Sequence, residues 1–499
     1  MTKWTVQTLA LAFMAAPLLV AGCGSSDGGG GTGGSLSLGG ASGTGGAIGR
    51  DAGSTGGVRM DAGQPDVVSS PDLPIAPQDL AAPLDVAAAD AAVDTAIAID
   101  GAALDTAAVD ASPAVDAGVV VCTMVTPFIG GDVTASLTLT KACSPYDIQS
   151  DINVDSNAIL TIEAGVTLYF ESSVSLNVGY STAGSLVALG TAASPIVFTS
   201  AAAMPSAGDW NNIHFWDNTM GGTKIAYAKL DYCGGYPDAC IVGNGGVKAS
   251  RVTLDHLTID HVGDASDGIL ENGAASNFVI TNSTFSHIPT SPDLGYAISV
   301  QAPSFAGIGA SNVFNGGAMI ELAGGTVAAT ASWVDPGTAI AVTNDLKLDG
   351  SGSPKLTLGA GMTFMFDSNI SFIIGYSIGG QLEIDGTAAQ PVVLKSLAAT
   401  PSPGDWDGLQ IWSNGKVAIS YANISDAGSS DADHPGDIVL NTNSTTVQLT
   451  VTNSSLTDSG GYGIFVPCGY LSTVPAATTN TFTGNVTGDI GPGPAGTGC

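Results

Sequence analysis

One short stretch of the chain gathers side chains that could cleave a polysaccharide. The residues of interest there are Arg251, His256, Asp260, His261, Asp264 and Asp267. Aspartates with a histidine can protonate a leaving group and activate water, and Arg251 adds a basic side chain to the same stretch. Asp264 and Asp267 could share one side of a turn. We take four residues as catalytic candidates: His261, Asp264, Asp267 and Arg251. The competing interpretation is a solvated turn with incidental histidines.

A Gly-Asp-Trp motif occurs twice, at 208–210 and at 404–406. The aromatic faces of Trp210 and Trp406 could stack on sugar rings, which makes both residues candidates for ligand binding. Alternatively, Gly and Asp form a turn and each tryptophan leads the following strand into the core, because alternating apolar residues continue after it.

An acidic loop near the C-terminus offers oxygen ligands of the kind that calcium prefers. Its candidate metal ligands are Asp426, Asp431, Asp433 and Asp437. Their spacing matches neither the EF-hand loop nor the calcium-binding nonapeptide repeat, so a solvated loop is the alternative. Apart from calcium, the sequence indicates no cofactor.

The charge balance narrows the set of partners. The chain has 12 Lys and Arg against 44 Asp and Glu, for a formal net charge of −32. Binding to nucleic acid requires clustered basic side chains, so we expect no nucleic-acid partner. The acidity suits an outer-surface protein or one that collects cations.

The N-terminus has the features of an export signal. Lys3 precedes an apolar run, Leu9–Val20, which is too short to span a bilayer permanently. The run ends in Leu-Val-Ala-Gly-Cys, which resembles a bacterial lipobox. The resemblance implies a signal peptide over 1–22 and a lipid on Cys23, through which the protein contacts the membrane. Gly24 implies release to the outer membrane or the cell surface.

The cysteine count agrees with export. Of seven cysteines, an even number remains once Cys23 carries lipid, as expected in an oxidising compartment. They could pair in many ways; neighbours in the sequence suggest Cys122–Cys143, Cys233–Cys240 and Cys468–Cys499. Zinc binding is the alternative, although no CxxC motif is present.

Residues 23–121 have the composition of a disordered tether. A Gly/Ser/Thr-rich part is followed by an Ala/Asp/Pro/Val-rich part. Such a segment cannot bury enough apolar surface to offset its loss of conformational entropy. As a coil it would reach about 50–60 Å and hold the following domain away from a membrane.

The remaining segment, 122–499, contains a duplicated block, about 146–235 and 340–430. LTIEAGVTLYF at Leu160 aligns without a gap on LTLGAGMTFMF at Leu356, and the match continues through both Gly-Asp-Trp motifs. A period this long indicates a duplicated unit with a finer repeat inside it.

The finer repeat consists of short alternating strands cut by Gly, Asn, Asp and Pro. Phrases such as VTLDHLTIDHVGDASDGI and YDIQSDINVDSNAILTIEAGVTLYF resemble rungs of right-handed parallel β-helix proteins of the pectin-lyase-like fold. We therefore predict an all-β, right-handed parallel β-helix built from a duplicated block and preceded by a disordered tether. The alternative fold is a pair of β-sandwiches, one for each block.

The resemblance is specific for architecture and poor for activity. Pectinolytic enzymes of this fold carry an adjacent Asp pair, Gly-His-Gly and Arg-x-Lys, and none of these marks is present. We expect a lipid-anchored cell-surface module that binds an extracellular glycan or a surface protein, or that is structural, and we lean against catalysis. The alternative is a lyase or glycoside hydrolase acting on acidic polysaccharide.

Overall fold

The computed structural model describes residues 122, 128–235, 239–244, 252–272, 278–289, 295–428, 434–441, 448–468 and 479–492. The chain divides into two units, Met1–Ala108 and Val109–Cys499, and all described residues belong to the second. The predicted signal peptide, Cys23 and the predicted tether lie outside the described residues. Among the residues described, no helix is long and apolar enough to cross a membrane.

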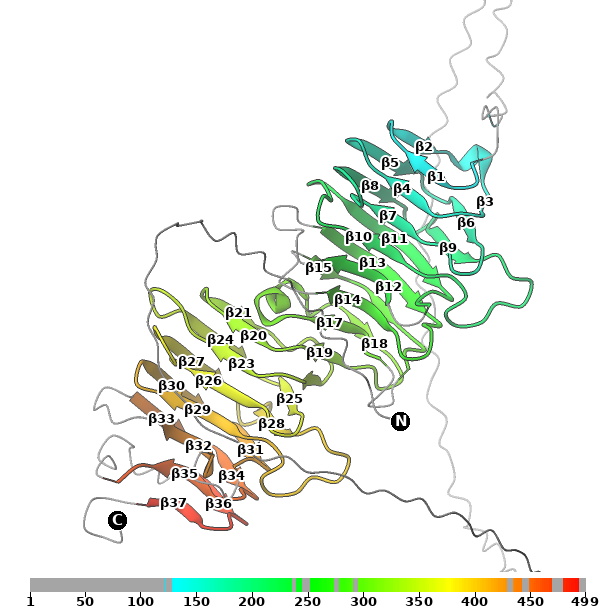
Figure 1. The fold of residues 1–499 in the computed structure, drawn as a ribbon. Helices are drawn as coiled ribbons and strands as arrows, with labels where there is room; N and C mark the ends of the chain where they lie inside the picture. Colours follow the sequence, from blue (N-terminus) through cyan, green and yellow to red (C-terminus); the bar gives the residue numbers. More distant parts are fainter. Residues whose placement is uncertain are drawn as a thin grey trace, which may run out of the picture. The chain divides into compact units, whose positions relative to one another are not determined.

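The second unit is a right-handed parallel β-helix, as predicted (Figure 1). One sheet of 14 parallel strands follows its whole length. These strands are β1 (Gly131–Val133), β4 (Ile152–Val154), β7 (Leu176–Val178), β10 (Ile213–Phe215), β12 (Ala239–Asn244), β14 (Asp267–Asn272), β17 (Ile298–Val300), β19 (Ile320–Leu322), β22 (Ile340–Val342), β25 (Thr363–Phe366), β28 (Val392–Ser396), β31 (Ala422–Ser425), β34 (Ser455–Thr457) and β36 (Thr481–Thr483).

An 11-stranded sheet closes the N-terminal half of the coil. It contains β2 (Leu137–Leu139), β3 (Tyr146–Ile148), β5 (Ala158–Ile162), β6 (Thr167–Phe170), β8 (Gly184–Leu189), β9 (Ile196–Ser200), β11 (Lys224–Asp231), β13 (Val252–Asp260), β15 (Phe278–Thr281), β16 (Thr284–Phe285) and β18 (Val313–Phe314). The two short 3-10 helices are η1 (Lys141–Cys143) and η2 (Ala302–Gly307).

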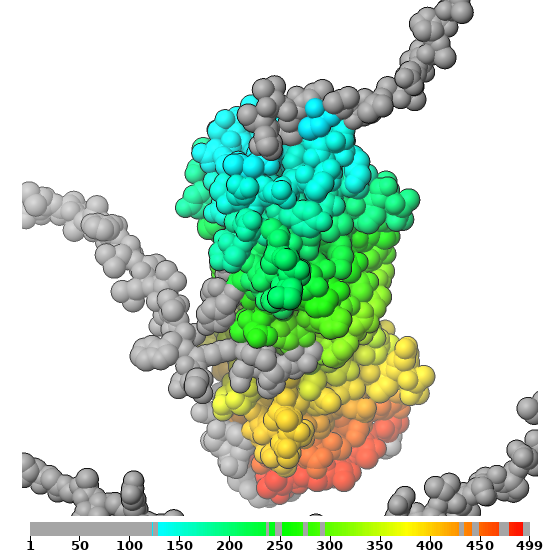
Figure 2. Space-filling model, turned by 90° about the vertical axis from the view of Figure 1, so that its right-hand side faces the viewer, coloured from blue at the N-terminus to red at the C-terminus, as the bar shows by residue number. Residues whose placement is uncertain are grey.

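Two further sheets close the C-terminal half. The seven-stranded sheet contains β20 (Gly325–Val327), β23 (Leu346–Leu348), β26 (Ser371–Ile374), β29 (Gly408–Trp412), β32 (Gly436–Asn441), β35 (Tyr462–Val466) and β37 (Gly488–Pro492). The five-stranded sheet contains β21 (Ala331–Trp333), β24 (Lys355–Gly359), β27 (Gly380–Asp385), β30 (Gly415–Ser420) and β33 (Gln448–Thr452). Figure 2 shows the described residues stacked in chain order. Because the 14-stranded sheet passes through both blocks, the fold is not a pair of separate sandwiches.

The core forms because equivalent strands place like residues above one another. Ile152 pairs with Leu176, which pairs with Ile213, which pairs with Ile241, and all four side chains are buried. A single rung cannot hide its apolar edge, but stacked rungs share one core.

Two strands of the N-terminal half bend around a corner of the coil. β11 pairs with β8 over its first part and with β9 over its last part. Between the two parts Tyr227 adopts a φ of 49°, and at the same level of β13 His256 adopts 53°. Left-handed backbone at one residue lets the strand change face and turns that side chain outward.

The duplicated blocks occupy different faces of the coil. β4, β7 and β10 belong to the 14-stranded sheet, whereas their sequence counterparts β23, β26 and β29 belong to the seven-stranded sheet. The strands that do enter the 14-stranded sheet in the second block, β25 and β28, match β6 and β9 of the 11-stranded sheet. Equivalent strands of the two copies therefore lie on different faces of the coil, displaced by one face from the first copy to the second.

Two of the predicted disulfides form, Cys122–Cys143 and Cys233–Cys240. Cys468 is also disulfide-bonded, while Cys499, its predicted partner, lies outside the described residues. The first bridge ties residue 122 to the N-terminal rung, and the second joins β12 to the turn that precedes it.

Candidate functional sites on the solenoid surface

Three aromatic side chains form a column at one corner of the coil. Tyr232, His261 and His287 follow the same edge of successive rungs, and their φ angles are 60°, 50° and 48°. The rings of Tyr232 and His261 stack with centroids 4.7 Å apart, and those of His261 and His287 also lie 4.7 Å apart, within 8° of parallel. This spacing equals the separation of adjacent strands, so the backbone itself sets the stack.

Two aspartates pair with this column diagonally. Asp231 Oδ1 lies 2.9 Å from His261 Nδ1, and Asp260 Oδ1 lies 2.7 Å from His287 Nδ1. Asp260 Oδ1 is also 3.4 Å from His261 Nδ1. Each carboxylate thus reaches the imidazole of the next rung, and we call Asp231, Asp260, His261 and His287 the histidine corner.

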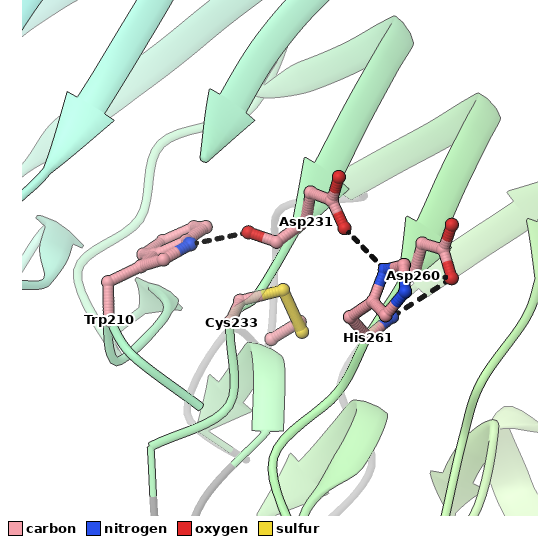
Figure 3. Close-up of a disulfide and its surroundings, with 6 residues drawn as sticks. Trp210, Asp231, Cys233, Asp260 and His261 are labelled. Carbon is pink, nitrogen blue, oxygen red and sulfur yellow. Dashed lines mark hydrogen bonds and ion pairs between the residues drawn. A yellow bond between two sulfur atoms is a disulfide. The ribbon is translucent and has the colours of Figure 1, made fainter. Parts of the chain in front are cut away.

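Asp231 also connects the histidine corner to the core and to the positively charged side chain of Lys229. Its main-chain oxygen accepts a 2.8 Å hydrogen bond from Trp210 Nε1 (Figure 3). Its second carboxylate oxygen, Oδ2, accepts a 2.6 Å bond from Lys229 Nζ. The Asp231 carboxylate is therefore held between the Lys229 ammonium group and the His261 imidazole, and these two contacts fix the positions of all three groups.

Three of the four catalytic candidates expected from the sequence, His261, Asp264 and Asp267, lie within the described residues. Asp264 lies in the turn after β13, and Asp267 begins β14 and accepts a 2.7 Å bond from the Tyr296 N–H. The contacts described for the His261 ring involve neither of them. Arg251 lies outside the described residues. Asp231 and His287 were missed because they come from other rungs, where sequence distance says nothing about stacking.

A neighbouring corner of the coil has a similar stack of a tyrosine on a histidine, but with one histidine in place of two. Tyr227 and His256 stack at 4.2 Å, and Asn282 occupies the next rung. Burial pushes the pKa of Asp255 up, but hydrogen bonds from Asn282, Thr281 and His256 outweigh it and lower the pKa overall. An open depression lies beside this corner, lined by Tyr227, Lys229, His256, Thr258, Asn282 and Thr284 among others.

The tryptophans of the repeated Gly-Asp-Trp motif lie in the core, which corrects their assignment as ligand-binding candidates. Trp210 and Trp406 are both fully buried. Trp210 stacks on Phe170 and Trp406 on Phe366, and the Trp406 Nε1–H donates to Ser425 O over 2.8 Å. Neither ring face can meet a sugar, and the alternative of a turn that leads each tryptophan inward is confirmed.

The two described aspartates of the acidic loop, Asp426 and Asp437, lie in different surroundings. Asp437 is on β32 and is fully buried, so neither a loop ligand nor a solvated carboxylate describes it. Asp426 follows β31, is largely buried, and accepts a 2.8 Å bond from the Ser425 hydroxyl. Asp431 and Asp433 lie outside the described residues.

A line of hydrogen-bonding side chains follows the outer surface of the 14-stranded sheet. Asn153 Nδ2 donates to Asp132 Oδ1 over 2.9 Å, and Asn177 Nδ2 donates to Asn153 Oδ1 over 3.0 Å. The line continues with Trp216, whose Nε1–H donates to Asn177 Oδ1 over 3.1 Å. An amide has two N–H donors and two lone pairs, so this ladder leaves each amide able to bond a ligand.

Aromatic rings border this ladder. Tyr180, 55% exposed, meets Trp216 edge-on with centroids 4.8 Å apart. Tyr180 and the ladder residues Asp132 and Asn153 line one open depression of about 360 Å³ together with Asp155. We call Asp132, Asn153, Asn177, Tyr180 and Trp216 the amide–aromatic face.

The second block repeats the aromatic pair without the ladder. Tyr376, 57% exposed, meets Trp412 edge-on at 4.8 Å. The ladder positions of the first block correspond in sequence to Lys347 and Ile373 in the second. The two copies therefore offer the same rings in different polar surroundings, and sequence reasoning overlooked both pairs because it followed the invariant Gly-Asp-Trp.

The coil, its three faces and its outward corners define the protein as a right-handed parallel β-helix. Residues 131–287 and 325–449 match the model of a pectate-lyase like beta helix domain; they make up more than half of the chain, which belongs to this family. A segment of 73 residues is 48% identical to Protein bark beetle of Drosophila melanogaster. This match covers 15% of the present chain and 2% of that protein. No solved structure matches the chain significantly.

Proposed function

We propose that this protein is a lipid-anchored, non-enzymatic surface module that binds an uncharged glycan along the amide–aromatic face. The observation that carries the proposal is the ladder from Asp132 through Asn153 and Asn177 to Trp216, with Tyr180 exposed beside it. Aromatic rings bind the apolar faces of sugars, and aligned amides and carboxylates can bond their hydroxyl groups.

Charge favours a neutral ligand over a polyuronide. The chain carries a formal charge of −32, and the face itself contains Asp132, with Asp155 beside it. Carboxylates accept hydrogen bonds from sugar hydroxyls but repel carboxylated sugars. A neutral polysaccharide strand therefore suits this surface.

Anchoring through Cys23 and the tether of residues 23–121 would present the coil away from a membrane. This part of the proposal has its own test. A Cys23→Ser substitution should abolish incorporation of labelled palmitate and release the protein from the membrane fraction. Retention of both would overturn the anchor without affecting the glycan proposal.

The histidine corner supports a second candidate, a lyase or hydrolase acting on acidic polysaccharide. It offers carboxylates, imidazoles and Lys229 within one corner. We rank it second because the formal charge of −32 on the chain opposes the approach of an acidic polysaccharide.

The test is a glycan array read with the natural chain and two matched variants. Tyr180→Ala should lower affinity for neutral glycans about tenfold or more, since one stacked ring contributes on the order of 1.4 kcal/mol or more. Tyr376→Ala, the same change in the second block, should leave affinity unchanged. Equal loss in both variants, or none in either, would refute the assignment to this face. Release of shortened products from polyuronides, with or without calcium, would favour the enzyme instead.

A further inference from the structure

The histidine corner has the composition and spacing of a cation site independent of the glycan surface. Asp260, His261 and His287 each offer one ligand atom, and these three atoms lie within 4.8 Å of one another. We propose that His261, His287 and Asp260 bind a zinc-class divalent cation on the outside of the coil.

Two of the three donor separations can be compared with those that such an ion needs, and the third is within 4.8 Å. Bonds of about 2.0–2.2 Å in a tetrahedral arrangement hold ligand atoms about 3.3 Å apart. Asp260 Oδ1 lies 3.4 Å from His261 Nδ1 and 2.7 Å from His287 Nδ1. Small rotations of exposed side chains close the remaining difference, since the His287 side chain is 70% exposed.

The backbone and a neighbouring ring orient these donors. Both histidines occupy left-handed corner positions, which direct their rings outward, and Tyr232 covers one face of His261. Asp231 Oδ1, 2.9 Å from His261 Nδ1, is a candidate fourth ligand. Lys229 bonds the other Asp231 oxygen, which limits the repulsion between the two carboxylates before an ion binds.

Donor chemistry selects the class of ion. Two imidazoles with one or two carboxylates suit zinc and related transition ions. Calcium prefers six to eight oxygen ligands, which this corner does not supply. The −32 formal charge of the chain raises the local concentration of any cation.

The molecule contains a matched control. The neighbouring corner has the same stack of a tyrosine on a histidine, with Asp255 3.1 Å from His256 Nδ1. The exposed fractions of the two histidine side chains are similar, 40% for His256 and 37% for His261. Two differences separate the corners: Asn282 stands in place of a second histidine in the next rung, and Ala226 stands in place of Asp231 in the preceding rung.

Zinc titration of the full chain by calorimetry, with competition by a coloured chelator, tests the site. We expect one saturable zinc per chain that calcium does not displace. His261→Asn and His287→Asn should each weaken binding by about 100-fold or more because each removes a direct ligand. His256→Asn should leave it unchanged, and Asn282→His should add a second, weaker equivalent.

Two results would overturn the proposal. One is the absence of saturable zinc binding in the natural chain. The other is binding that survives both His261→Asn and His287→Asn in variants whose circular dichroism and melting temperature match the natural chain.

Discussion

Asp437 occupies in the second copy the position that Cys240 holds in the first. Ile241 pairs with Ile213 and Ile438 pairs with Leu409, so the preceding residues, Cys240 and Asp437, are equivalent. Cys233, the disulfide partner of Cys240, corresponds to Ala427: each main-chain oxygen accepts a 2.9 Å bond from a glycine N–H of the next rung. A covalent bridge in one copy is replaced by a buried carboxyl in the other.

This equivalence predicts that the missing bridge can be installed. The double substitution Ala427→Cys with Asp437→Cys should form a disulfide and stabilise the fold by about 3 kcal/mol, the value expected for closing a loop of this length. Intact mass without reductant and thermal unfolding measure both effects. The gain should vanish when reductant is added, and a pair that remains as free thiols would contradict the equivalence.

Burial raises the pKa of Asp437 well above its ordinary value, and the charges of Asp426 and Asp458 add to the effect. The Ala427 main chain and the Ser459 hydroxyl partly offset it, although neither carboxyl oxygen has a hydrogen-bond partner of normal geometry. A group with a raised folded pKa stabilises fully below its unfolded pKa of about 4 and loses this contribution as the pH rises through the folded value.

The Asp437→Asn variant should therefore gain stability relative to the natural chain as the pH increases from about 4. At neutral pH we expect a gain of about 1 kcal/mol or more, because each unit by which the folded pKa is raised costs the natural carboxyl about 1.4 kcal/mol, whereas the amide does not titrate. Denaturant unfolding at a series of pH values measures the difference. A constant difference between the two proteins across pH would show that Asp437 does not titrate on unfolding.

The pKa of Asp349 is shifted in the opposite direction, to a lower value. Burial pushes its pKa up, but the N–H groups of Gly379, Ile378 and Ser377 outweigh burial and lower the pKa overall; each lies 2.8 Å from a carboxylate oxygen. The stability that Asp349 provides is present above pH 4 and is lost as the pH falls through the folded pKa.

Asp349→Asn should cost about 1 kcal/mol at neutral pH, because the loop is partly exposed and solvent screens the charge. The cost should shrink in acid, where the natural carboxyl is also neutral. Asp155 occupies the matching position of the first copy and accepts bonds from the Ser181 and Thr182 N–H groups. Because the loss of such bonds destabilises the loop, Asp155→Asn should also reduce the unfolding free energy at neutral pH.

Core and surface aromatics should separate stability from binding. Trp210→Phe loses the bond to the Asp231 oxygen and part of the buried volume, so we expect a loss of about 1–3 kcal/mol in unfolding free energy with glycan affinity unchanged. Tyr180→Ala should lower glycan affinity and leave the unfolding free energy unchanged. Melting curves and the glycan array, measured on the same preparations of both variants, separate the two effects. Weaker glycan binding by Trp210→Phe under conditions where that variant is fully folded would count against the amide–aromatic face.

Residues that act within one rung could be predicted from the sequence. Alternation placed Leu160, Ile162 and Val166 inside, and the aligned blocks indicated a duplicated coil. The pairings Cys122–Cys143 and Cys233–Cys240 were also accessible, since both partners are near in the chain. Such features depend on which side of its own strand a residue occupies.

Contacts between rungs could not be predicted in this way. Ile152 stacks on Leu176, but Leu176 stacks on Ile213, a much longer step, because turns of unequal length separate the strands. The meeting of His261 with Asp231 and His287 depends on these steps.

The sequence by itself therefore determined a solenoid of repeated strands, because burial is set by local alternation. Only the tertiary structure decided which side chains meet on the surface and that the second copy is turned by one face. The physical reason is that strand register and face depend on the accumulated lengths of all preceding turns.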